Sequence, residues 1–251
     1  MNFSYISIGA LHLPVYGLFA AVGLIAALLL TQRTARAVGL PPDKVWNAGM
    51  FAVVSAFVVS RVLLVVFSFA MFRAEPMLVM AQPSLTYTGV AITGVLSFLY
   101  LRWQGLPVLA VADAFAPSAM VVWFALSLGH FFEGTDAGMP TRLPWGVTMP
   151  DDTMLGRVHP VQIYAALAAV GLGVWLLRQL PRRRQDGVVA ARGLVAGGLI
   201  SFLLGFLRQP VETYGDALLD PAQAAALLLM LAGEVMLAMP AHRSEETVDA
   251  E

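Results

Sequence analysis

His130 and Glu133, near the middle of an otherwise apolar chain, have the residue types and the spacing of an acid–base pair. They are three residues apart at the end of an apolar run, so on a helix they project from one face. An imidazole beside a carboxylate can act as a general base with an orienting partner. A plain polar helix end in a lipid headgroup region accounts for the same pattern, and the sequence leaves both interpretations open.

Three arginines, Arg61, Arg157 and Arg208, have side chains suited to phosphate, because the guanidinium fork matches phosphate geometry. Arg61 lies inside an apolar run, where insertion of an arginine costs about 2.5–3.5 kcal/mol, so such residues are candidates for function. We expect Arg61 to bind an anionic headgroup, and Arg157 and Arg208 to be similarly placed. The alternatives are a structural ion pair of Arg61 with Asp113 or Glu234, and an interfacial Arg208 that reaches toward water.

A further polar group opens the apolar run that starts near residue 160. His159-Pro160 is typical of a helix start, with proline in the first turn. Gln162 and Tyr164 then project from the first turns of that helix. Trp145, in the polar segment before it, is typical of an anchor at the membrane–water interface.

The elements that must position these residues are apolar helices. The chain has 251 residues, of which 59% are hydrophobic and 12% are charged, whereas a soluble domain is about 25% charged. This composition predicts an all-α, polytopic membrane protein. There is no basic block of the nucleic-acid-binding type, so no nucleic-acid partner is expected. The absence of cysteine excludes a disulfide, a thiolate metal site and a cysteine nucleophile, and we expect no metal or other cofactor.

Seven apolar segments approach the roughly 20 residues that cross a bilayer. They are approximately 12–31, 46–71, 86–103, 108–132, 160–180, 193–207 and 218–240. We expect one seven-helix domain over residues 1–241, with a loop at about 133–158 and a polar cytoplasmic tail over 242–251. A short interfacial piece is expected within 72–85.

The basic residues are distributed unequally between the two sides of such a bundle. One side has Arg33, Arg36, Lys44, Arg102, Arg178, Arg182, Arg183, Arg184, Arg192 and Arg243, and the other has Arg73, Arg142, Arg157 and Arg208. The positive-inside rule therefore predicts the N-terminus outside and the C-terminus in the cytoplasm, with a periplasmic 133–158 loop. This orientation brings one set of polar residues to a single depth in the outer leaflet: Tyr16, Arg61, Thr88, His130, Glu133, His159, Gln162, Tyr164 and Arg208.

Short segments along most of the chain carry a resemblance to a known family. They are Pro14–Leu18, Ser60–Arg61, Tyr87–Gly89, Asp113–Pro117, Ser127–Gly134, Thr141–Gly146, His159–Ala165 and Phe206–Pro210. The most specific is His159–Ala165, which resembles His-Pro-x-Gln-Leu-Tyr-Glu. Together they resemble the bacterial prolipoprotein diacylglyceryl transferases, which are seven-span enzymes of the inner membrane.

The chain departs from the family pattern at several polar positions. Thr88 stands where the family has histidine, and Ser127 stands where its signature has arginine. His130 and Glu133 replace two asparagines of that signature, and Thr135 replaces its glutamate. Ala165 replaces a glutamate, while Ser201 and Gly205 replace an arginine and a glutamate.

The resemblance implies transfer of diacylglycerol from phosphatidylglycerol to the thiol of a lipobox cysteine, with release of glycerol phosphate. It implies His130 or His159 as the base, and Arg61, Arg157 and Arg208 around the phosphate. Tyr16, Thr88, Gln162 and Tyr164 complete the expected substrate-binding set. The implied partners are phosphatidylglycerol and prolipoprotein signal peptides, in the bacterial inner membrane.

Two other functions remain open at this point. A catalytically silent lipid- or lipoprotein-binding protein would keep the same fold without turnover. A small transporter is favoured less, because a transport route needs polar groups on both sides of the membrane midplane.

Overall fold

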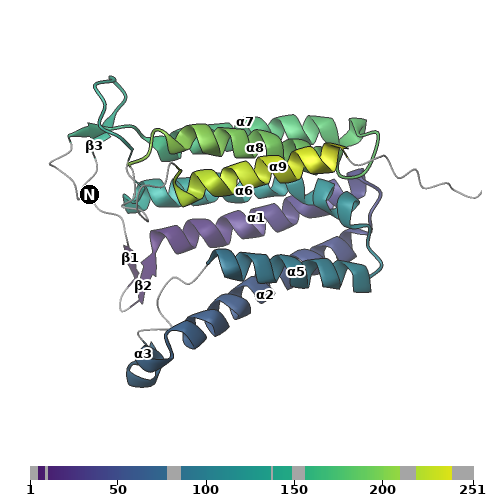
Figure 1. Cartoon of the computed structure of the whole chain (residues 1–251), viewed down its shortest axis with the longest axis horizontal. Helices are drawn as coiled ribbons and strands as arrows, with labels where there is room; N and C mark the ends of the chain where they lie inside the picture. The colour runs from purple at the N-terminus through teal and green to yellow at the C-terminus, as the bar shows by residue number, and fades with distance from the viewer. Residues whose placement is uncertain are drawn as a thin grey trace, which may run out of the picture.

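The computed structural model describes residues 5–8, 11–77, 86–136, 138–148, 156–209 and 219–238. Long helices lie side by side along one axis, and two short hairpins lie at one end (Figure 1). The helices are α1 (Val15–Ala37), α2 (Pro42–Phe67), α3 (Phe69–Ala74), α5 (Tyr87–Trp103), α6 (Val108–Glu133), α7 (Val161–Gln179), α8 (Val188–Gly205) and α9 (Pro221–Ala238), with a 3-10 turn, η1, at Leu180–Arg182. The strands are β1 (Tyr5–Ile8) paired with β2 (Leu11–Pro14), and β3 (Val147–Thr148) paired with β4 (Arg157–Val158), both antiparallel.

In the described part of the chain, six helices are long and apolar enough to cross a bilayer. They are α1, α2, α6, α7 together with η1, α8 and α9. Helix α5 has 17 residues, which at 1.5 Å per residue makes it slightly shorter than the roughly 30 Å hydrocarbon core. The prediction of an all-α, polytopic membrane protein is confirmed.

The helix ends differ from the predicted spans where polar residues continue a helix. Helix α2 begins at Pro42 rather than near residue 46, because Asp43 and Lys44 fit its first turn. Helix α8 begins at Val188 rather than 193. The residue before it, Gly187, has a φ of 90°, a left-handed conformation that cannot continue a right-handed helix toward the N-terminus. The short α3 overlaps the start of the expected interfacial piece at 72–85, at residues 72–74. Residues 78–85 of that piece and the 242–251 tail lie outside the described residues.

Helix α6 is the centre of the bundle and packs against α1, α7 and α8. The α1–α6 contact is close because a Cβ on Gly23 would lie 2.4 Å from the Cβ of Ala125. Further along, Thr31 donates a hydrogen bond to Ser118 at 2.7 Å, and the Thr34 hydroxyl donates to the Ala114 carbonyl at 2.7 Å. Small residues and hydroxyl bonds of this kind hold helices together where lipid removes the hydrophobic driving force.

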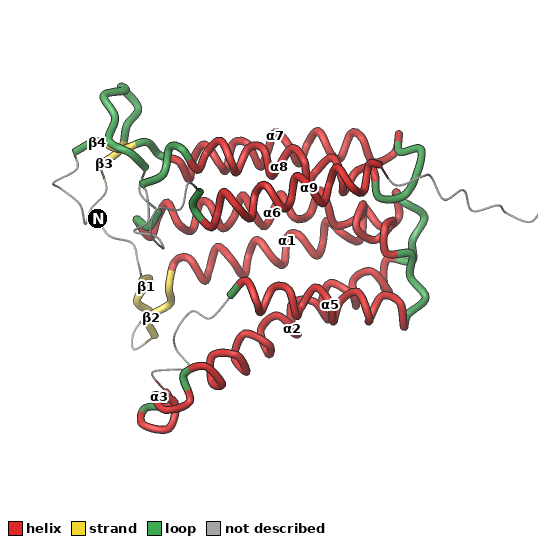
Figure 2. Tube along the Cα trace, in the orientation of Figure 1, coloured by secondary structure: helices red, strands yellow, loops and turns green. Residues whose placement is uncertain are grey.

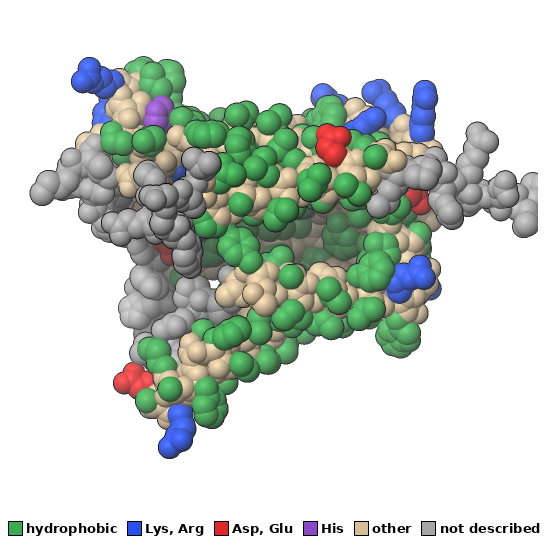
Figure 3. Space-filling view, viewed as in Figure 1, with side chains coloured by type: hydrophobic (Ala, Val, Ile, Leu, Met, Phe, Trp, Pro, Cys, Tyr) green, Lys and Arg blue, Asp and Glu red, His purple; other side chains and the backbone are tan. Residues whose placement is uncertain are grey.

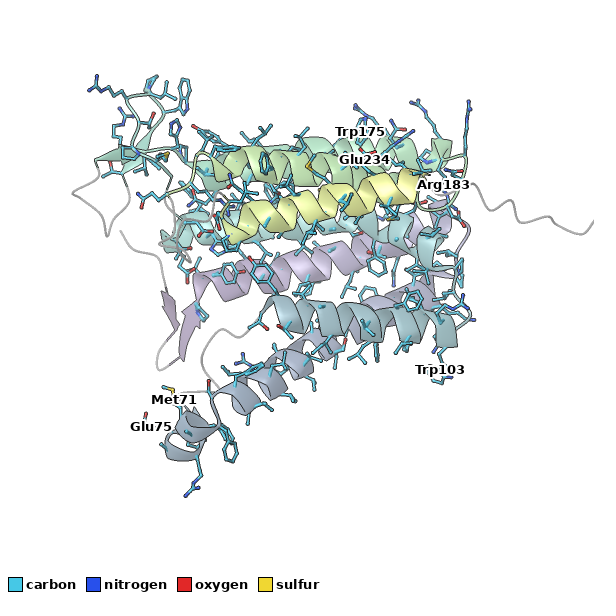
Figure 4. The ribbon with its side chains drawn as sticks, in the orientation of Figure 1. Met71, Glu75, Trp103, Trp175, Arg183 and Glu234 are labelled. Atoms are coloured by element: carbon cyan, nitrogen blue, oxygen red, sulfur yellow. The ribbon has the colours of Figure 1, made fainter. Side chains whose placement is uncertain are left out.

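Asp113 is fully buried and holds the start of α8. Its carboxylate accepts hydrogen bonds from the backbone N–H groups of Gly187 and Ala190, each at 2.8 Å. Arg183 donates to the same carboxylate at 3.2 Å and lies at the end of the bundle opposite β1 and β2 (Figure 4). Arg183, not Arg61, is therefore the ion-pair partner of Asp113.

We expect Asp113→Ala to destabilise the protein by about 3–5 kcal/mol, because it removes the buried carboxylate that pairs with Arg183 and leaves two helix-start amides without their acceptor. Asp186→Ala is the matched control, since it removes the more exposed partner of Arg183 and is expected to cost about 1 kcal/mol or less. Thermal unfolding of both variants in one detergent checks this. Equal melting temperatures would mean that Asp113 does not hold the α8 start.

Candidate active site

The last turn of α6 brings His130, Glu133 and Thr135 together. Nδ1 of His130 lies 2.8 Å from the Thr135 hydroxyl oxygen, and that hydroxyl lies 3.4 Å from Oε2 of Glu133. The predicted pairing of His130 with Glu133 is therefore made through Thr135, which the sequence did not single out as a site residue. The Tyr16 ring, from the first turn of α1, lies 4.6 Å from the His130 ring.

Gln162, in the first turn of α7, ties this helix to the segment after α6. Its Nε2 donates to the carbonyl oxygens of Thr135 and Asp136, at 2.5 and 2.7 Å. The side chain is only 4% exposed, and its Oε1 has no hydrogen-bond partner among the described residues. Because Asp136 has a φ of 57°, these two bonds stabilise an uncommon backbone conformation next to Thr135. The buried Oε1 remains available to a donor from a ligand.

Arg208, just after α8, reaches the same segment through its backbone. Gly138 and Arg208 form an antiparallel bridge, and Met139 N–H donates to the carbonyl of Leu207 at 2.8 Å. Nε of Arg208 is buried and has no hydrogen-bond partner in the part of the chain that the structure describes. A buried guanidinium N–H without a partner is costly, so this group is well suited to an anionic ligand.

His159, Tyr164 and Trp145 form a second hydrogen-bonded group beside α7. The indole N–H of Trp145 donates to the Tyr164 hydroxyl at 2.8 Å, and that hydroxyl lies 3.5 Å from Nδ1 of His159. An indole N–H can only donate, so the phenol oxygen accepts from Trp145.

Arg157 stabilises the loop that carries Trp145. Its Nε donates to the Gly146 carbonyl at 3.0 Å, and its Nη2 donates to the Pro144 carbonyl. Figure 2 shows β3, β4 and the adjoining loops beyond the helix ends, at the end of the bundle where β1 and β2 lie. Two of the five guanidinium donors are thus used on protein carbonyls, which favours a structural role over the phosphate-binding role expected from the sequence.

Arg61 and Thr88 lie on a different part of the bundle. Arg61 is on α2, with its Cζ 5.3 Å from the centre of the Phe57 ring, and Thr88 is in the first turn of α5. Gly89 lies against Leu63, so the start of α5 packs beside this part of α2. The second half of α2 diverges from α1 and from the α6–α9 helices (Figure 1). The residues around His130 and the pair on α2 and α5 therefore form two separate groups.

An apolar groove is lined by residues of α6, α8 and α9. It has a volume of about 550 Å³, and its lining includes Phe115, Trp123, Ser201, Leu229 and Met236. The molecular surface is hollowed between α9 and α5 (Figure 3). Glu234, an alternative ion-pair partner considered for Arg61, is exposed on α9 (Figure 4). A groove of this composition suits hydrocarbon rather than a charged group.

The arrangement at the end of α6 has the parts that a nucleophilic displacement needs. Nδ1 of His130 contacts the Thr135 hydroxyl, which in turn contacts the Glu133 carboxylate, and such a chain of contacts can orient a general base. Arg208 and Gln162 supply a buried donor and a buried acceptor beside Gly138 and Thr135, respectively. This end can therefore take a proton and bind an anion.

Comparison with known proteins points to the same family that the short segments of the sequence resemble. A family model described as "Prolipoprotein diacylglyceryl transferase" matches residues 4–239. A phosphatidylglycerol–prolipoprotein diacylglyceryl transferase of Solidesulfovibrio magneticus is 33% identical over 221 residues, covering 84% of this chain and 82% of that protein. Proteins of the same name from Geobacter sulfurreducens and Methylococcus capsulatus are each 29% identical, covering 95% and 93% of both chains, respectively.

Proposed function

Because the chain belongs to the prolipoprotein diacylglyceryl transferase family, we propose that it transfers the diacylglyceryl group of phosphatidylglycerol to a cysteine thiol of a prolipoprotein. The donor and the acceptor class are those in the names of its relatives. The protein is then a transferase of lipoprotein biosynthesis, and its second substrate is the signal-peptide region that carries the lipobox cysteine.

This function places the enzyme in the bacterial inner membrane with seven spans, α5 being the shortest. The N-terminus is outside and the C-terminus is in the cytoplasm, as the arginine-rich junctions indicate. The end of the bundle with His130, Arg208 and the 138–148 loop then faces the periplasm. A prolipoprotein cysteine is accessible to the site from that side, beside the outer leaflet that contains the donor lipid.

The reaction needs one base and one cation. The thiol proton moves to His130, the sulfur attacks the glyceryl carbon that carries the phosphate ester, and a C–S bond forms as the C–O bond breaks. Glycerol phosphate leaves with the electron pair of that bond, so negative charge develops on its oxygen. Arg208 stabilises this charge, because a preorganised donor in a buried site favours the transition state.

His130 is assigned as the base rather than His159, because a hydroxyl lies 2.8 Å from its Nδ1 with a carboxylate behind that hydroxyl. At His159 the Tyr164 hydroxyl lies 3.5 Å from Nδ1, which orients the ring less firmly. His159 is then a binding or structural residue. Tyr16 packs on His130, and the apolar groove of α6, α8 and α9 is suited to an acyl chain of the donor.

The observation that carries this proposal is the buried Nε of Arg208, which has no hydrogen-bond partner among the described residues and whose backbone pairs with Gly138, shortly after the His130–Thr135–Glu133 group. Such a site can take a proton from a thiol and stabilise a departing phosphate. A catalytically silent lipid-binding protein would need the second property but not the first.

We expect the purified protein, reconstituted in phosphatidylglycerol vesicles, to transfer the diacylglyceryl group to a synthetic peptide with a lipobox cysteine. Mass spectrometry of the peptide measures this, and a peptide with serine in place of that cysteine is the matched control. The gene is also expected to rescue a strain depleted of its own transferase. Correct insertion with no transfer and no rescue would leave only the silent lipid-binding function.

A further inference from the structure

The chain turns sharply after α6 and brings Thr135 back over the last turn of the helix. Gly134 has a φ of 80°, a left-handed conformation that glycine adopts without strain. Thr135 N–H donates to the His130 carbonyl at 3.1 Å, and Gly134 N–H donates to the Phe131 carbonyl at 3.3 Å. These two bonds form a Schellman motif, in which residue 135 is placed beside residue 130. Gln162 fixes the following segment from the other side through the Thr135 carbonyl.

Side chains in these two positions of a Schellman motif usually make an apolar contact. Here they make a polar one, because Nδ1 of His130 lies 2.8 Å from the Thr135 hydroxyl oxygen. The Thr135 hydroxyl has one proton, and it donates that proton to Oε2 of Glu133 at 3.4 Å. An ionised carboxylate can only accept. When the hydroxyl proton is directed to this carboxylate, the hydroxyl oxygen accepts from Nδ1–H of His130, and Nε2 is left with the lone pair.

We propose that Thr135 is a positioning residue for the transfer reaction: its hydroxyl links Glu133 to His130 and keeps His130 in the Nδ1–H tautomer, with Nε2 free to take the thiol proton. This inference rests on the proposed function for its catalytic consequence, whereas the tautomer itself is independent of it. In a nucleophile–histidine–carboxylate triad the carboxylate fixes the tautomer of the histidine. Here Glu133 would act in the same way through the Thr135 hydroxyl, which lies between the base and the acid.

The charged and titratable groups around His130 are compatible with this role. Tyr16 faces the ring from α1, Glu133 is on the same helix, and Glu133 and Asp136 both interact electrostatically with the Tyr16 hydroxyl.

The tautomer is tested directly by nitrogen NMR of the full chain with ¹⁵N-labelled histidine, in detergent micelles at a pH where the histidines are neutral. His130 signals are assigned by their loss in His130→Asn. We expect the neutral His130 ring to carry its proton on Nδ1 in the wild type, and to move toward the Nε2–H form in Thr135→Val. A wild-type ring protonated on Nε2 would overturn the proposal whether or not the protein transfers lipid.

Transfer rates test the consequence for catalysis. Thr135→Val is expected to lower the rate about tenfold or more at saturating phosphatidylglycerol, because the favoured tautomer then presents a proton instead of a lone pair. Thr135→Ser keeps the hydroxyl and is expected to restore the rate, while Thr148→Val changes an exposed threonine of β3 and should leave it unchanged.

The combined outcomes separate the two proposals. A wild-type Nδ1–H tautomer that Thr135→Val abolishes, in a protein without transfer activity, supports the structural relay and contradicts the proposed function. Transfer by the wild type that Thr135→Val leaves unchanged in rate and in pH profile contradicts the positioning role of Thr135. A rate lost in Thr135→Ser as well as in Thr135→Val contradicts it too, since the hydroxyl would then not be the group that matters.

Discussion

Replacing His130 with asparagine is expected to lower the rate of diacylglyceryl transfer by about 10²–10⁴-fold, the range for loss of a general acid–base group. Asparagine has no group that takes a proton near neutral pH, but it is small and polar enough to keep the end of α6 and the packing of Tyr16. Initial rates with phosphatidylglycerol vesicles and a lipobox peptide measure the effect. The protein should still unfold at nearly the wild-type temperature.

This substitution is informative because asparagine is also the residue that the family signature has at this place. If position 130 only supported the fold, asparagine would be a good replacement and the rate would stay within about tenfold of the wild type. His159→Asn is the comparison, and a smaller loss is expected from it, since the 3.5 Å contact of its Nδ1 with the Tyr164 hydroxyl orients the ring less firmly than the 2.8 Å contact at His130. A larger loss in His159→Asn than in His130→Asn would transfer the role of the base to His159.

The sequence was informative about helices because apolar length is a strong and local signal. Six predicted spans have counterparts long and apolar enough to cross a bilayer, and the short 86–103 segment folds as α5. The spacing of His130 and Glu133 also predicted correctly that the two side chains belong to one polar group. The start of α7 after His159-Pro160 was predicted within one residue, since proline marks that position clearly.

Contacts between distant segments could not be predicted in the same way. Asp113 and Arg183 are 70 residues apart, and nothing in the apolar pattern of their helices indicates which arginine reaches the acid. Arg157 has the same side chain as a phosphate ligand, but its donors are used on loop carbonyls whose positions depend on the folded loop. The second half of α2, the helix that carries Arg61, diverges from α1 (Figure 1), and residue depth alone does not indicate that divergence.

The position of Thr135 beside His130 could have been predicted from a local signal in the sequence, the glycine that ends α6. A glycine directly after an apolar helix predicts a left-handed cap, and the cap determines that the residue after the glycine returns to the last turn. His130, Gly134 and Thr135 have the spacing of that motif. A polar residue after a helix-ending glycine therefore becomes a candidate partner for the residue five positions before it.

Replacing Arg208 with glutamine is expected to lower kcat/KM for phosphatidylglycerol by about 10²–10³-fold, the range for removing one donor from a preorganised anion site. The loss should fall on the chemical step, because negative charge on the phosphate increases as the C–O bond breaks. Arg208→Lys keeps the charge but not the guanidinium fork, so an intermediate rate is expected. Kinetics in vesicles with varied phosphatidylglycerol content separate kcat from KM.

The side chain of Arg208 can be changed without breaking the bridge to Gly138, because that bridge is made by backbone groups. The thermal stability of Arg208→Gln should therefore stay close to the wild type, which separates a binding role from a structural one. Arg178→Gln is the matched control, since Arg178 is exposed in the last turn of α7 at the opposite end of the bundle. If both glutamine variants transferred lipid at the wild-type rate, the buried Nε of Arg208 would have no part in binding phosphate.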